Sequence, residues 1–201
     1  SRATLEEADK KKVTEKDYKG REDFRDKTII TIDGEDAKDL DDAIGIERYG
    51  NGYKLYVHIA DVSHFVKENS ELDKEAILRG TSVYFADRVI PMLPEAISNG
   101  VCSLHPGEDK LTMSVVMTIS EKGDVIDAKI CEGVIKTNHR MSYNNVYEIL
   151  NGNKELIEKY KDIYDDILLM SELSDILTEK RRKRGYINFN FHEAKFIFDE
   201  N

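Results

Sequence analysis

Apolar and polar residues alternate with a period of two in several parts of this chain, which is the pattern of half-buried β-strands. The predicted strands are residues 28–32, 43–49, 53–59, 111–120, 125–135, 186–191 and 195–198. The turn Gly50-Asn51-Gly52 joins the second and third of these, and the polar stretch from Glu121 to Asp124 joins the next two. Because both connections are short, each pair of strands predicts an antiparallel hairpin.

Other segments carry their apolar residues at helical spacing. Residues 70–79 begin with Ser70, a favourable N-cap, and residues 142–150 are closed by Gly152. Apolar side chains from Leu156 to Arg181 follow one helical face and predict a single long helix. Together with the hairpins, these segments predict an α+β fold, a mainly antiparallel sheet packed by one long and several short helices.

The two least regular parts of the sequence are the N-terminal leader and a central proline-containing stretch. Residues 1–20 are polar and predict a leader with loosely packed short helices that begin at Thr4 and Thr14. Residues 86–109 contain all three prolines and are expected to be irregular. The remaining length, residues 21–201, is sufficient for one domain with its own core.

Composition and charge narrow the classes of protein. The two cysteines, Cys102 and Cys131, form no CxxC motif or disulfide framework, which favours a reducing compartment. No apolar stretch reaches membrane-spanning length, and no signal peptide opens the sequence. The formal net charge of −10 by itself argues against binding to nucleic acid, because phosphate groups usually require a basic surface.

The most informative segment is an acidic string from Asp33 to Asp42, which holds five aspartates, one glutamate and the single lysine Lys38. It lies between the apolar runs 28–32 and 43–46, so its charges cannot spread apart as in a free tail. Two carboxylates about 5 Å apart repel by roughly 3 kcal/mol at an effective dielectric near 20. Protonation, arginines or cations can compensate, and hard divalent ions suit an all-oxygen ligand set best. The string therefore predicts a metal site.

The spacing of the acids restricts the kind of metal site. An EF-hand is excluded because every register puts alanine or lysine at a ligand position. Zinc is disfavoured because the string contains no histidine or cysteine. Asp39, Asp41 and Asp42 are too close in sequence to share one small ion in regular structure. In a bent loop they can serve two ions, or one ion and a polarised water, as in two-metal phosphoryl transfer.

The string and several later motifs resemble the ribonuclease II/ribonuclease R superfamily, whose catalytic module is the RNB domain. Within that superfamily the motifs follow the bacterial ribonuclease R branch. They run in the same order from about Arg21 onward and are Thr31 to Ala43, Val57-His58-Ile59-Ala60-Asp61-Val62, Gly80-Thr81-Ser82-Val83-Tyr84-Phe85, Val89-Ile90-Pro91-Met92-Leu93-Pro94, Ile97 to Leu104, and Glu193-Ala194-Lys195-Phe196.

The resemblance implies a role for individual residues. The implied metal ligands are Asp33, Asp39, Asp41 and Asp42, the implied catalytic residues are Asp41 and Asp39, and the implied base-stacking residues are Tyr84 and Phe189. The implied cofactor is Mg²⁺, with Mn²⁺ as a substitute. Stacking on an aromatic ring tolerates any base, which agrees with degradation that has no sequence preference.

The resemblance also implies a reaction and partners. The expected activity is hydrolysis of RNA from its single-stranded 3′ end, with release of nucleoside 5′-monophosphates, in the cytoplasm. The RNB domain of the superfamily continues well beyond the part that this chain resembles. Residues 21–201 are therefore expected to be the N-terminal part of the domain, truncated at its C-terminus, with little activity alone. Flanking RNA-binding modules of a longer chain are expected to supply the basic surface that is missing here.

Two other functions remain open from the residues alone. The tripeptide Asp39-Leu40-Asp41 also matches the DxD element by which some glycosyltransferases hold Mn²⁺ and a nucleotide sugar. Alternatively the acids only order a solvated loop, and the segment is a non-catalytic metal- or RNA-binding piece.

Several residues have a simpler structural interpretation. His58 lies in an apolar strand pattern and is expected to be a hydrogen-bonded core histidine and not a general base. Arg21 and Arg25 are expected to pair with neighbouring acids. Cys102 and Cys131 are expected to be buried and inert.

Overall fold

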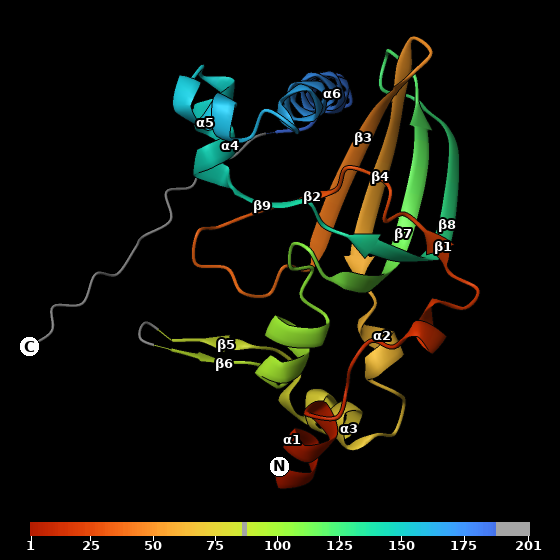
Figure 1. Cartoon of the computed structure of the whole chain (residues 1–201), viewed down its shortest axis with the longest axis vertical. Coiled ribbons are helices and arrows are strands. Elements are labelled where there is room, and N and C mark those ends of the chain that lie inside the picture. Colours follow the sequence, from red (N-terminus) through yellow and green to blue (C-terminus); the bar gives the residue numbers. More distant parts are fainter. Residues whose placement is uncertain (86–87, 188–201) are drawn as a thin grey trace, which may run out of the picture.

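A seven-stranded mixed sheet organises the fold (Figure 1), in a computed structural model that describes residues 1–85 and 88–187. Its strand order is β1-β8-β7-β4-β3-β2-β9, and a separate two-stranded sheet pairs β5 with β6. The strands are β1 (Glu22–Asp23), β2 (Ile30–Asp33), β3 (Asp42–Tyr49), β4 (Gly52–Ala60), β5 (Val83–Tyr84), β6 (Val89–Ile90), β7 (Asp109–Ile119), β8 (Val125–Lys136) and β9 (His139–Ser142). All neighbours are antiparallel except at the two edges, where β1 pairs with β8 and β9 with β2 in parallel.

The two predicted hairpins are confirmed. β3 and β4 pair in continuous antiparallel register, and β7 and β8 pair likewise with one irregularity near Ile119. Glycine is required at Gly52, because a Cβ atom there would lie 2.1 Å from the Ile119 carbonyl oxygen. The predicted strand at 195–198 and most of the one at 186–191 lie outside the described residues.

The helices are short except for one. They are α1 (Arg2–Ala8), η1 (Glu15–Tyr18, a 3₁₀ turn), α2 (Val62–Phe65), α3 (Glu71–Arg79), η2 (Ala96–Val101, a π-helix), α4 (Tyr143–Leu150), α5 (Lys154–Lys159) and α6 (Tyr164–Lys183). Ser70 caps α3 as expected, and Ser142 caps α4, each accepting a backbone N–H with its hydroxyl. The α+β fold class is confirmed. Across the described residues, none of the helices combines the length and the apolar character that crossing a membrane requires.

The single long helix predicted from Leu156 to Arg181 is wrong, because the chain breaks into α5 and α6. Tyr160 and Ile163 have non-helical backbone angles, and both side chains are buried. They pack into a hydrophobic cluster with residues of β2, β9 and α4. Packing of both side chains against these distant elements accompanies the break, so tertiary contacts override the helical periodicity here.

Two irregular regions are more ordered than their sequences suggest. In the leader, Thr4 lies inside α1, is buried, and donates its hydroxyl to Glu75 of α3 at 2.8 Å. The stretch 86–109 contains β6 and the π-helix η2 in addition to irregular chain. Leu173 of α6 packs on one end of the main sheet. The loop between β2 and β3 extends from the sheet toward the β5–β6 hairpin (Figure 1).

Candidate functional site

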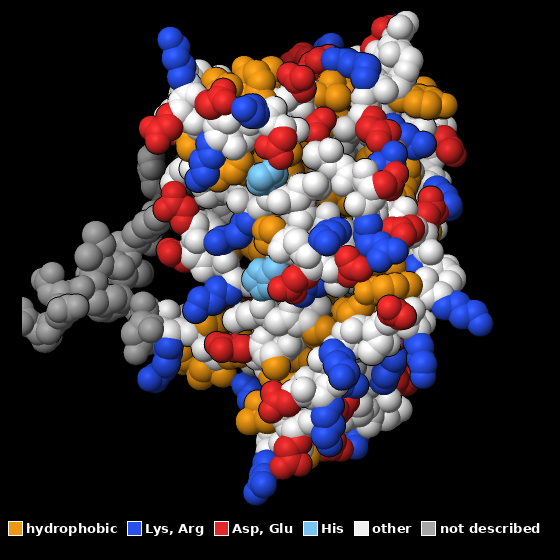
Figure 2. All heavy atoms as spheres, in the orientation of Figure 1, with side chains coloured by type: hydrophobic (Ala, Val, Ile, Leu, Met, Phe, Trp, Pro, Cys, Tyr) orange, Lys and Arg blue, Asp and Glu red, His pale blue; other side chains and the backbone are white. Residues whose placement is uncertain are grey.

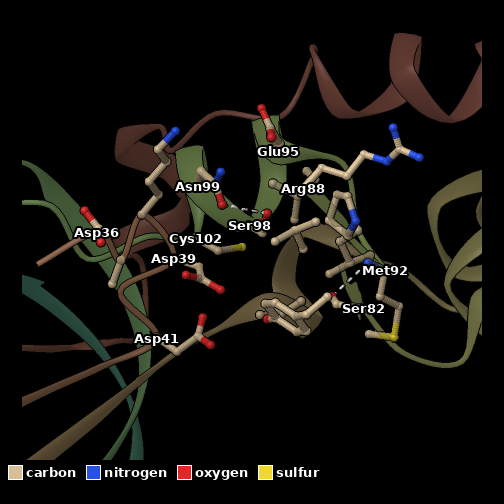
Figure 3. Close-up of a pocket in the computed structure, with 18 residues that line it drawn as sticks. Asp36, Asp39, Asp41, Ser82, Arg88, Met92, Glu95, Ser98, Asn99 and Cys102 are labelled. Carbon is tan, nitrogen blue, oxygen red and sulfur yellow. Dashed lines mark hydrogen bonds between the residues drawn. The ribbon is translucent and has the colours of Figure 1, made fainter. Parts of the chain in front are cut away.

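The acidic string forms the connection between two adjacent strands of the main sheet. Asp33 is the last residue of β2 and Asp42 is the first of β3. Between them the loop bends away from the sheet, and Asp36, Asp39 and Asp41 line a cavity of about 800 Å³. Figure 3 shows these three carboxylates on one side of the cavity. The structure therefore places two of the four predicted metal ligands in the cavity wall and the other two at the ends of the strands.

The four predicted ligands nevertheless interact electrostatically. Burial and the neighbouring carboxylates of Asp39, Asp42 and Asp33 raise the pKa of Asp41. Burial and the charges of Asp42 and Asp39 likewise raise the pKa of Asp33, while Arg140 opposes this change. The neighbouring acids therefore disfavour the charged forms of Asp33 and Asp41, and a nearby positive charge would stabilise them.

A divalent cation fits this need. One carboxylate oxygen of Asp33, Oδ2, is buried and has no hydrogen-bond partner among the described residues, so an acceptor is available for a ligand. The part of the chain that the structure describes contains no group of three or more His, Cys, Asp or Glu side chains already arranged to hold an ion. An ion that keeps several waters and binds through few carboxylates, as Mg²⁺ does, is compatible with such an open set.

The middle of the acidic loop is anchored by Ser103 and Leu104, which follow η2 in the chain. Leu40 is fully buried in the core, between two acidic neighbours that face the cavity. The hydroxyl of Ser103 donates to the Lys38 carbonyl at 2.8 Å and accepts the Leu40 N–H at 3.0 Å. The N–H of Leu104 donates to the Leu40 carbonyl at 2.9 Å. These contacts fix the backbone on both sides of Asp39.

The opposite wall of the cavity comes from the β5–β6 hairpin and the segment that follows it. Tyr84 of β5 lines the cavity with 71% of its surface exposed, so its ring is available to a ligand. Ser82 accepts the Met92 N–H at 3.0 Å and ties the two arms of the hairpin together (Figure 3). The structure thus brings Tyr84 to the same cavity as Asp39 and Asp41. Phe189 lies outside the described residues.

A third wall is the π-helix η2, which the sequence did not predict. Such helices are rare and often lie at functional sites. Asn99 of η2 lines the cavity. Two later side chains hold the backbone of η2. His105 Nε2 donates to the Asn99 carbonyl at 2.9 Å, and the buried Lys110 donates to the Gly100 carbonyl at 2.9 Å. Bonds to backbone carbonyls cannot be recognised in the sequence. The one available indication is Lys110, a lysine in the mainly apolar strand β7.

The remaining candidate side chains are structural. His58 is fully buried, its Nδ1 lies 2.8 Å from Ser114 Oγ, and burial lowers its pKa to about 4, which confirms a core histidine. Cys102 is buried and lines the cavity, and burial raises the pKa of its thiol to about 12, so it is a poor nucleophile. Cys131 is only partly buried, contrary to expectation, because it lies on β8 next to the part that the two-residue edge strand β1 covers.

The two N-terminal arginines form the ion pairs that were expected. Arg21 contacts Asp61 at 2.6 Å, and the two side chains are 4% and 2% exposed. Arg25 contacts Asp23 at 2.6 Å and Asp109 at 2.8 Å near the surface. Acidic and basic side chains are also interspersed over the face drawn in Figure 2.

Comparisons with known proteins place the chain among known sequences and folds. The family model described as the RNB domain matches residues 21–201. Ribonuclease R 1 of Lactococcus lactis is 52% identical over 195 residues, which are 96% of this chain and 24% of that protein. Two similar solved structures are those of Mycoplasma genitalium RNase R. The one with double-stranded RNA has a TM-score of 0.90 and 31% identity, and the match covers 100% of this chain and 36% of that one. The one with ribose-methylated single-stranded RNA has a TM-score of 0.88 and 32% identity, and the match covers 98% of this chain and 31% of that one. The chain spans about a quarter of the length of the curated relatives it matches.

Proposed function

Because the chain belongs to the RNB-domain family, we propose that it supplies the metal-binding part of a hydrolytic 3′-to-5′ exoribonuclease. One observation carries the proposal: Asp39 and Asp41 line a single cavity with the exposed ring of Tyr84. The cavity therefore combines carboxylates for a cation with an aromatic surface for a base. The substrate is the 3′ end of single-stranded RNA, and the products are nucleoside 5′-monophosphates.

In this proposal the four aspartates of the loop hold Mg²⁺, for which Mn²⁺ can substitute. They are Asp33, Asp39, Asp41 and Asp42. When bound, the cation supplies charge stabilisation at the scissile phosphate and makes a bound water more acidic. Asp39 and Asp41 face the cavity, so we assign them to orient the attacking water and the cation beside the phosphodiester. The pKa of Asp41 is already raised, and a cation reverses that effect by favouring the charged carboxylate.

Recognition of the RNA end is assigned to stacking. An aromatic ring contributes about 1–3 kcal/mol per stacked base and does not distinguish the bases. Tyr84 is well exposed in the cavity for this purpose, and Phe189 is proposed as the second stacking residue. The mixed surface charge and the net charge of −10 give this chain little attraction for phosphate by itself. We therefore propose that flanking RNA-binding modules of a longer, cytoplasmic protein bring the RNA to the cavity.

The test uses the longest natural chain that contains this segment, with a 5′-labelled single-stranded RNA that ends in a 3′-hydroxyl. We expect Mg²⁺-dependent stepwise shortening of the labelled RNA, with nucleoside 5′-monophosphates as the other product, and loss of this shortening in Asp41→Asn. Asp127→Asn, on the exposed first half of β8, is the matched control and should retain activity. Intact RNA with wild-type protein in both Mg²⁺ and Mn²⁺ would refute the proposal. The 201-residue chain alone is expected to release little or nothing.

A glycosyltransferase is not retained as a second candidate. The DxD match covers Asp39 to Asp41 only, whereas the family match covers residues 21–201. A non-catalytic role remains the alternative that the RNA assay addresses, because it predicts that Asp41→Asn changes nothing.

A further inference from the structure

Arg140 of β9 reaches the first half of the acidic loop from the edge of the main sheet. One terminal nitrogen, Nη2, donates to three backbone carbonyls: Gly34 at 3.2 Å, Glu35 at 2.7 Å and Ala37 at 2.9 Å. Since that nitrogen carries two hydrogens, at least one of them is shared between two acceptors. The three carbonyls all point toward the Arg140 guanidinium, so residues 34–37 form a tight turn.

The topology explains why a residue so distant in sequence acts here. β9 pairs in parallel with β2, and Arg140 lies in register with Thr31 while Ser142 lies in register with Asp33. The two strands therefore run side by side toward the same end, where β2 becomes the loop. A long side chain that starts at Arg140 can follow β2 and contact the turn beyond it.

Neighbouring contacts from the same edge hold the same turn. Asn144, in the first turn of α4, donates its side-chain amide to the Glu35 carboxylate at 2.8 Å. The Ala37 N–H closes the turn on the Gly34 carbonyl at 3.2 Å. The second half of the loop is held separately by Ser103. Asp39 thus lies between two anchored segments.

We propose that Arg140 is a positioning residue that shapes the acidic loop for a divalent cation. Its guanidinium fixes the turn at 34–37, and thereby the path of the loop from Asp33 to the segment around Asp39 that Ser103 holds. The proposal relies on the proposed function for the identity of the cation. Without the clamp, mutual repulsion drives the carboxylates apart, and a cation must then reassemble the loop when it binds.

The clamp needs a long cationic side chain that reaches three fixed carbonyls. A guanidinium is planar and weakly hydrated and suits several fixed acceptors, whereas an ammonium is a compact, strongly hydrated charge. Loss of a residue that orients metal ligands typically weakens metal affinity by about 10–100-fold. We expect this loss in Arg140→Met, and a smaller one in Arg140→Lys, which keeps the charge near Asp33 but not the shared geometry.

The first measurement is Mn²⁺ affinity of the full-length protein, followed by electron paramagnetic resonance of the free ion. Arg140→Met should weaken binding by about 10–100-fold. RNA hydrolysis at saturating Mg²⁺ should stay within a few-fold of wild type, because the clamp acts on ion binding. Arg48→Met is the matched control, since Arg48 of β3 forms a surface ion pair with Glu172 at 2.6 Å, and it should bind Mn²⁺ like wild type.

The second measurement is amide hydrogen exchange of the metal-free protein. Arg140→Met should speed exchange at Ala37 and its neighbours and leave the β3–β4 hairpin unchanged. Unchanged Mn²⁺ affinity in Arg140→Met overturns the proposal, whether or not exchange changes. If wild-type protein binds Mn²⁺ and responds to Arg140→Met but hydrolyses no RNA, the positioning role stands and the nuclease proposal fails.

Discussion

The pH dependence of stability should contain a measurable contribution from His58. This residue is fully buried and packs against both Phe24 and Tyr56, with ring centroids 5.1 Å and 6.4 Å away. Its Nδ1 has a partner in Ser114, but its Nε2 is buried without one among the described residues. A protonated imidazole would have to place a second N–H where nothing in the described structure accepts it, which agrees with the pKa lowered to about 4 by burial.

The sign of the effect follows from the two pKa values. The unfolded chain protonates His58 near its ordinary pKa of 6.5, whereas the folded protein does so only near 4. Below pH 6.5 the unfolded state therefore binds the additional proton, and stability falls as the pH decreases toward 4. The contribution is zero above about pH 7. From the two pKa values it amounts to about 2 kcal/mol at about pH 5 and approaches about 3 kcal/mol below about pH 4.

Urea denaturation of wild type and His58→Gln at several pH values isolates this contribution. Carboxylates titrate in both proteins, so their effect cancels in the difference between the two free energies of unfolding. We expect that difference to shrink by about 2 kcal/mol between about pH 8 and about pH 5, as only wild type loses stability through this residue. A difference that stays constant within about 0.5 kcal/mol over this range would show that His58 is not held neutral by the core.

Three further predictions concern charges and the cavity. Asp61→Asn should lower the free energy of unfolding by about 3–5 kcal/mol in urea denaturation, because it removes the buried partner of Arg21 and leaves only the exposed Glu132 carboxylate at 4.0 Å; Arg21→Met combined with Asp61→Leu should cost less than Asp61→Asn alone. Asp41→Asn should raise the melting temperature in metal-free buffer, because it removes a carboxylate that burial and the neighbouring acids disfavour in its charged form, and it should reduce the rise on adding Mg²⁺. Tyr84→Ala should weaken the binding of single-stranded RNA to the full-length protein by about 5–150-fold in fluorescence anisotropy, whereas Tyr49→Ala, also exposed but at the β3–β4 turn, should not.

Local patterns were sufficient where the interactions that decide the structure are local. The β3–β4 hairpin follows from alternation around Gly50-Asn51-Gly52, and α3 follows from the capping hydroxyl of Ser70. The break between α5 and α6 did not follow, because burial of Tyr160 and Ile163 against distant elements decides it.

The candidate site shows the same division. The acidic string identified Asp39 and Asp41, since charge density and flanking strands are visible in one short segment. Ser103 and Arg140 were missed because they lie 65 and 103 positions from the loop carbonyls to which they donate. Any residue with a donor can make such a bond, so composition gives no indication of which one does.

Two walls of the cavity belong to two different sheets. The acidic loop grows out of the main sheet, whereas Tyr84 belongs to the small β5–β6 sheet, which shares no strand with it in the described part of the chain. Substitutions in one wall therefore need not disturb the backbone of the other. We expect a protein of this architecture to be able to lose its carboxylates and still bind a nucleotide. Its nucleotide preference should likewise be able to change while its carboxylates stay in place. In such a protein, binding of a nucleotide and cleavage of the chain can be changed independently of each other.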